Sequence, residues 1–187
     1  LLIKKIEKLN PNIILLHHLH GYYINIEVLF KYLIKRNKKV FWVFHDCWAI
    51  TGHCAYFDYV DCKLWELECS NCVQKNEYPK SIFIDRSNKN FKEKKFLFTQ
   101  LNDLTIITVS DWLSKITNRS FLKSKNRVTI PNGIDINSFY PYQNNNRNVN
   151  TLKKYNIKSE KTIIGVASVW DNRKGLKEFV KLRKILN

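Results

Sequence analysis

A histidine and an aspartate directly follow a short apolar run. Residues 40–44, VFWVF, have the β-branched and aromatic side chains typical of a buried strand, and the run stops at His45 and Asp46. Open α/β sheets bind ligands beyond the carboxyl ends of their strands. His45 and Asp46 are therefore candidate catalytic residues. The alternative is a structural histidine that is satisfied by a neighbouring backbone group.

Four cysteines follow in an irregular segment, residues 46–80, with the spacing C-x7-C-x6-C-x2-C. They are Cys54, Cys62, Cys69 and Cys72. Four sulfurs complete a tetrahedral zinc site that has no open position for catalysis, so such a zinc would be structural. Unligated thiols, or disulfide and redox chemistry, are the alternatives. Cys47 lies outside the spacing, and we expect it to be a small buried side chain.

Three histidines follow an earlier strand that is expected over residues 13–16. In an extended backbone His17 and His18 point to opposite faces, and no acidic residue stands near them or near His20 in the sequence. We therefore expect these histidines to form the polar lining of a cleft and not a metal site.

A third candidate site is the loop SVWDNRKG, residues 168–175, between an expected strand and an expected helix. Arg173 and Lys174 stand just before its glycine. Backbone amides at the start of a helix, together with two cations, favour a phosphate group. An exposed basic turn without a ligand would have the same sequence pattern.

Strands and helices alternate through the first 130 residues. Apolar spacing predicts helices over residues 2–9, 24–35, 88–101 and 110–121, and strands over 13–16, 40–44, 104–109 and 128–130. Ser110 is the expected N-cap of the last helix. Strand-helix-strand units pair in parallel, so the sequence predicts an α/β fold with a doubly wound parallel sheet.

After Pro131 the sequence becomes polar and rich in turn-forming residues, and Asn132 and Gly133 form a strong turn signal. We expect three parts: a first domain over residues 1–141, a linker with a short helix over 142–160, and a strand-loop-helix over 161–187. The strand of the last part is expected at 162–167 and its helix at 175–186. These last residues cannot bury a core alone, so the fold is expected to be incomplete at both ends.

Composition limits the function. The chain has 187 residues, 44% of them hydrophobic, and 32 Lys+Arg against 16 Asp+Glu give a formal charge of +16. It is globular and has no apolar stretch long enough to span a bilayer, so we expect a cytoplasmic location. The positive charge favours phosphorylated ligands or an anionic membrane. Scattered lysines and the lack of a nucleic-acid-binding motif argue against nucleic acid as a partner.

Several segments together resemble the retaining glycosyltransferases of family 4, as found in bacterial capsule, exopolysaccharide and O-antigen gene clusters. They are PNIILLHHLHGYYIN, VFWVFHDCWAITGHCAYF, CSNCVQK, TVSDWL, VTIPNGIDINSFYP and GVASVWDNRKGL, in this order. The resemblance implies a GT-B fold, in which two Rossmann-like domains face each other across a cleft. The first domain would bind a saccharide acceptor, which we expect to be lipid-linked, and the second a nucleotide-sugar donor.

The resemblance also implies roles for single residues. His45 matches a histidine beside the donor sugar, and Asp46 would position it. Arg173 and Lys174 match the basic pair that contacts the donor diphosphate, which makes a metal cofactor unnecessary for catalysis. Ser168 stands where many relatives have another arginine, so diphosphate binding would depend more on Arg173 and Lys174.

The resemblance further assigns Asn132 and Gly133 to the hinge between the two domains. Two expected parts are absent: a glycine-rich loop that would precede Leu1 and a Glu-x7-Glu pair that would follow Asn187. We therefore expect a partial copy that does not transfer sugar alone. Lysines over residues 89–95 would rest on the inner face of an anionic membrane. The alternatives are a zinc-stabilised basic binding module and an inactive truncated remnant.

Overall fold

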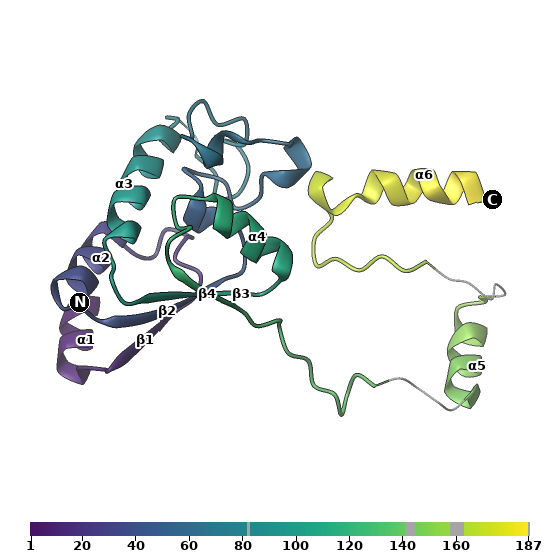
Figure 1. Cartoon of the computed structure of the whole chain (residues 1–187). Helices are drawn as coiled ribbons and strands as arrows, with labels where there is room; N and C mark the ends of the chain where they lie inside the picture. Colours follow the sequence, from purple (N-terminus) through teal and green to yellow (C-terminus); the bar gives the residue numbers. More distant parts are fainter. Residues whose placement is uncertain (82, 141–144, 158–162, 187) are drawn as a thin grey trace. The chain divides into compact units, whose positions relative to one another are not determined.

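The structure is a computed structural model that describes residues 1–81, 83–140, 145–157 and 163–186. The chain divides into two compact units, Leu1–Asn132 and Gly133–Asn187, which are described separately. Figure 1 shows the helices and strands of each unit.

The first unit is built on a four-stranded parallel sheet in the order β1-β2-β3-β4. Its strands are β1 (Ile13–Leu16), β2 (Lys39–Phe44), β3 (Leu104–Thr108) and β4 (Asn126–Thr129). Each strand was predicted within two residues of its observed bounds. The alternation of strands and helices confirms the predicted Rossmann-like α/β class.

Four helices accompany the sheet: α1 (Leu2–Leu9), α2 (Ile26–Lys35), α3 (Ser87–Thr99) and α4 (Asp111–Arg119). Helices α2, α3 and α4 each lie between two consecutive strands in the sequence, as parallel pairing requires. The side chain of Asn25 caps α2 by accepting a hydrogen bond from the Val28 amide at 3.0 Å. The predicted cap of α4 is confirmed, because Ser110 Oγ accepts from the Leu113 amide at 3.2 Å.

Aromatic side chains form the centre of the core between the sheet and the helices. The ring of Trp42 on β2 lies 5.4 Å from that of Phe30 on α2 and 4.9 Å from that of Phe98 on α3. Phe30 and Phe98 also contact each other, with ring centroids 4.4 Å apart. Such buried rings contribute much of the free energy that fixes the two helices on β2.

The cysteine-containing segment between β2 and α3 is irregular but packs into the same core. It contains three short 3-10 turns, Trp48–Ile50, Asp58–Val60 and Leu64–Glu66. The rings of Phe57 and Trp65 stack with centroids 4.8 Å apart, and both side chains are buried. The segment is therefore part of the scaffold.

The second unit contains helices α5 (Asn145–Lys154) and α6 (Leu176–Leu186). The helix predicted over residues 175–186 is confirmed as α6. The strand predicted over 162–167 is not formed by residues 163–167, and Ile164 and Val166 are exposed; Thr162 lies outside the described residues. A strand needs a partner for its backbone, and the described part of this unit contains no other strand.

Part of the predicted linker also lies outside the described residues, namely positions 142–144 and 158–160. Helix α5 occupies positions 145–154, within the segment for which a linker with a short helix was predicted. Over the ranges that the structure describes, no helix is long and apolar enough to cross a membrane.

Lys94 on α3 ties this helix to the segment after β2. Its buried Nζ donates hydrogen bonds to the carbonyl oxygens of Trp48 at 2.7 Å and Thr51 at 2.9 Å. Burial lowers the pKa of Lys94 from 10.5 to about 7. The charged form is therefore less favourable in the folded protein than in the unfolded chain.

This shift predicts a pH-dependent stability. Between pH 7 and the ordinary lysine pKa, the unfolded chain binds one more proton than the folded protein. The free energy of unfolding should rise by up to about 1.4 kcal/mol per pH unit from pH 7 to 8.5. Urea unfolding across this range measures the slope. Lys94→Met should lower the slope by this contribution, whereas the exposed control Lys95→Met should keep it; equal slopes in both variants would contradict the assignment.

Candidate functional site

The carboxyl ends of β1 and β2 bring the predicted His45 beside the earlier histidines. The two strands pair in parallel with Leu16 opposite Trp42, so the chain leaves both strands at the same edge of the sheet. His17 Nδ1 lies 3.1 Å from His45 Nε2, and the His17 carbonyl accepts a hydrogen bond from Trp42 Nε1 at 3.1 Å. The imidazole rings of His17 and His18 both stack on His45, with centroids 5.4 and 4.7 Å away.

Asp46 is buried and joins the two loops. Its Oδ2 lies 2.8 Å from His20 Nε2 and 3.6 Å from His18 Nδ1, while Oδ1 accepts a hydrogen bond from the Trp48 amide at 2.9 Å. No acidic residue stands near these histidines in the sequence, but the fold brings one to them, since the carboxylate comes from the end of the next strand. In the described part of the chain, Asp46 is hydrogen-bonded to His20 and Trp48 and not to His45.

The surroundings of His45 favour its neutral form. Burial lowers its pKa, the nearby His18 and His17 act in the same direction, and Asp46 opposes them. A neutral imidazole has one donor and one acceptor nitrogen. Because Nε2 of His45 faces His17 Nδ1, the other ring nitrogen is the one that can exchange a hydrogen bond with a ligand hydroxyl.

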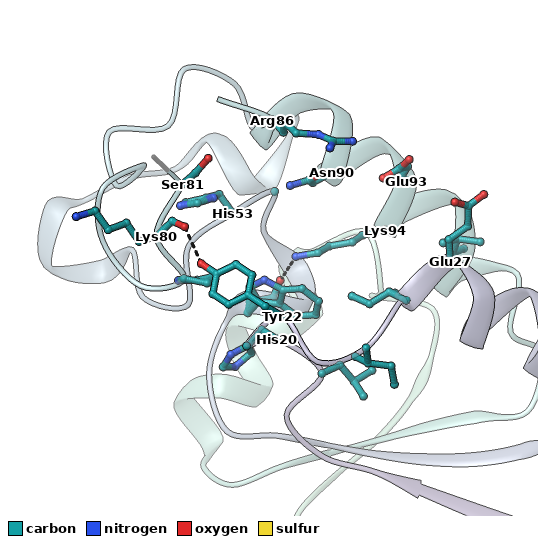
Figure 2. A pocket seen from close by; sticks show the side chains of 18 residues that line it. His20, Tyr22, Glu27, His53, Lys80, Ser81, Arg86, Asn90, Glu93 and Lys94 are labelled. Carbon is teal, nitrogen blue, oxygen red and sulfur yellow. Dashed lines mark hydrogen bonds between the residues drawn. The ribbon is translucent and has the colours of Figure 1, made fainter. Parts of the chain in front are cut away.

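A cavity of about 310 Å³ lies next to the histidines. Figure 2 shows that its wall combines residues of the loop after β1, of α3 and of the cysteine-containing segment. His20 and Trp48 line both this cavity and the hollow around His45. His53 also lines the cavity; its Nε2 is buried and has no hydrogen-bond partner among the described residues. Polar groups and aromatic faces in one hollow suit a small organic ligand.

The four predicted zinc ligands, Cys54, Cys62, Cys69 and Cys72, line one small cavity, whereas Cys47 is buried elsewhere. A hydrogen bond from the Cys54 thiol lowers the pKa of Cys72 to about 7, and burial raises that of Cys69 to about 11. These positions fit a shared zinc only in part. Among the described residues, the group whose ligand atoms converge closely enough for a metal is His18, His20 and Asp46, without a cysteine. Structural zinc at the cysteines remains a proposal.

Arg173 and Lys174 belong to the second unit. They lie in a 3-10 turn, Asn172–Lys174, which is followed by Gly175 and then by α6. The backbone φ of Gly175 is +73°, a conformation that favours glycine. The Lys174 amide donates to Asp171 Oδ1 at 2.9 Å, and Arg173 lies 3.6 Å from the Asp171 carboxylate. The turn is thus held by Asp171, which also supplies a carboxylate next to the two cations.

The predicted hinge residues Asn132 and Gly133 lie on the two sides of the boundary between the compact units. A Cβ atom added at Gly133 would meet no described atom within 4 Å, so the surrounding space does not require glycine there.

Two residues of the first site had no sequence signal. Tyr78, whose hydroxyl lies 2.9 Å from His20 Nδ1, comes from the far end of the cysteine-containing segment, and Lys94 comes from α3.

The chain is similar to one curated protein of Escherichia coli (strain K12), named "Putative colanic acid biosynthesis glycosyl transferase WcaC". The two are 31% identical over an alignment of 133 residues, and the match covers 67% of this chain and 32% of that protein. The chain therefore spans about a third of the length of the relative it matches. Comparison with known protein families gave no match, and neither did comparison with solved structures.

Cys72 should be the most reactive thiol. With a pKa of about 7 and partial exposure, it is mainly thiolate at pH 7.5, whereas Cys47 is buried and its pKa is raised. Iodoacetamide should modify Cys72 at least tenfold faster than Cys47, as followed by peptide mass spectrometry. The rate should reach half its maximum near pH 7. Equal rates at the two cysteines would contradict the geometry, and a bound zinc should suppress the reaction of Cys72.

Proposed function

We propose that this protein is a glycosyltransferase that moves a sugar from a nucleotide-sugar donor to a saccharide acceptor during surface polysaccharide synthesis. The observation that carries the proposal is the 31% identity, over 133 residues, to a protein named as a glycosyl transferase of colanic acid biosynthesis. The cluster of polar side chains at the carboxyl edge of a parallel sheet supports it, because ligands of α/β proteins bind at that edge.

In the finer form of the proposal, the protein is a retaining enzyme of family 4 with a GT-B fold. The first unit binds the acceptor and the second unit the donor. The 310 Å³ cavity is our candidate for the acceptor site. Tyr22 and Trp48 supply ring surface for a sugar, and Glu27, Asn90 and His53 supply groups that bond to hydroxyls.

The chemistry follows from the charge that develops in the reaction. When the sugar leaves its nucleoside diphosphate, negative charge builds up on the leaving phosphate. Arg173 and Lys174 would stabilise this charge as fixed cations, so that no metal is needed at that position. The neutral His45 would hydrogen-bond to the donor sugar and hold it for attack by the acceptor hydroxyl.

Two variants should separate these roles in the full-length gene product. His45→Ala should lower the rate of sugar transfer about a hundredfold and leave the affinity for UDP and GDP unchanged, since His45 is assigned to the sugar. Lys174→Ala should weaken the binding of the preferred nucleotide, measured by calorimetry. Lys177→Ala, an exposed lysine on α6, is the control for charge.

Either of two outcomes would contradict the proposed function. One is the absence of nucleoside diphosphate release from every UDP- and GDP-sugar when a membrane extract supplies the acceptor. The other is transfer that proceeds at the unaltered rate in His45→Ala.

We further propose that the protein acts at the cytoplasmic face of an anionic membrane on a lipid-linked acceptor. Lys89, Lys92 and Lys95 on α3 are exposed, whereas Lys94 points into the core. Each membrane-facing lysine contributes about 1 kcal/mol on phosphatidylserine vesicles. Replacing the three by glutamine should weaken co-sedimentation about a hundredfold. Replacing the exposed Lys4, Lys5 and Lys8 of α1 removes the same charge elsewhere and should have little effect; equal losses would contradict this contact.

A further inference from the structure

We propose that His18, His20 and Asp46 form a binding site for a divalent transition-metal ion such as Zn²⁺. The ligand atoms are His18 Nδ1, His20 Nε2 and Asp46 Oδ2, which lie within 4.8 Å of one another. The site joins the loops that follow β1 and β2. It is distinct from the cysteine cavity and does not depend on the proposed glycosyltransferase function.

The distances fit a common ion. His18 Nδ1 and His20 Nε2 are 3.2 Å apart, and Asp46 Oδ2 lies 2.8 Å from the second nitrogen and 3.6 Å from the first. Two ligands that each lie ~2.0–2.1 Å from a tetrahedral zinc are ~3.3 Å apart. The three atoms therefore already have nearly the separation that one bound ion requires.

Neighbouring groups leave the right lone pairs free. His20 Nδ1 lies 2.9 Å from the Tyr78 hydroxyl, and when it donates its proton there, Nε2 carries a lone pair that faces Asp46. Asp46 Oδ1 accepts from the Trp48 amide, which leaves Oδ2 for the ion. Outer hydrogen bonds of this kind orient the ligands in protein metal sites.

The proton count also favours an ion. Three groups with lone pairs converge on one point, and each proton in the metal-free cluster links only two of the three ligand atoms. A metal ion satisfies all three at once and compensates the charge of the buried carboxylate.

The exposure of the ligands gives the site an entrance. The side chains of His20 and Asp46 are 8% and 6% exposed, whereas that of His18 is 52% exposed. The ion can enter from the His18 side. Three protein ligands leave at least one coordination position for water or for an oxygen atom of a ligand.

Cobalt is the probe that distinguishes this site from the cysteines. Titration of the metal-free protein with Co²⁺, followed by absorption spectroscopy, should show an ion in an environment of nitrogen and oxygen; an ion at the cysteines would add thiolate-to-cobalt charge-transfer bands. Equilibrium dialysis with Zn²⁺ gives the stoichiometry. His18→Ala and Asp46→Asn should each weaken this cobalt site at least a hundredfold. The matched control His17→Ala should change its affinity by less than threefold, because His17 faces His45.

A second arm removes the cysteines. Any band of thiolate origin should disappear in Cys69→Ser/Cys72→Ser, while the nitrogen and oxygen site persists. The proposal is overturned if His18→Ala binds Co²⁺ with unchanged affinity and spectrum, or if His17→Ala loses as much affinity as His18→Ala. His18 is half exposed, so this variant decides the question even if Asp46→Asn does not fold; circular dichroism verifies the fold of each variant.

Discussion

The parallel pairing of β1 with β2 is the constraint on which the polar edge depends. Leu16 stands opposite Trp42, so the residues that follow each strand reach the same edge with a fixed offset. A shift of the register by one residue would turn every side chain of a strand to the other face. Trp42 opposes such a shift, because its ring packs against Phe30 and Phe98 and its indole N–H donates a hydrogen bond to the His17 carbonyl.

The same packing explains why the irregular segment after β2 is ordered. It has little regular secondary structure, but Phe57 and Trp65 anchor it in the core and Lys94 holds its first turn through two backbone carbonyls. Its far end delivers Tyr78 to His20. Side chains separated by more than fifty residues thus meet because both are attached to one packed core. The wall of the cavity and the orientation of the histidines have a common structural origin.

Much of the first unit could be predicted from the sequence, because local signals determine it. Apolar runs located the four strands, and Ser110 marked the start of α4. The contact between Asp46 and His20 could not be predicted in this way, since it depends on which strands are neighbours. The strand expected at 162–167 is not formed by residues 163–167, although their side chains favour a strand. The described part of the second unit offers them no pairing partner, which local sequence does not reveal.

The strands are added to the sheet in the order in which they occur in the chain, and this has a consequence for synthesis on the ribosome. His18, His20 and Asp46 all emerge with the first two strands, whereas Tyr78 follows 32 residues after Asp46. At ~5–20 residues per second this interval lasts about 2–6 s. The nascent chain therefore passes through a stage in which the histidines and the carboxylate are present and the hydroxyl that orients His20 is not.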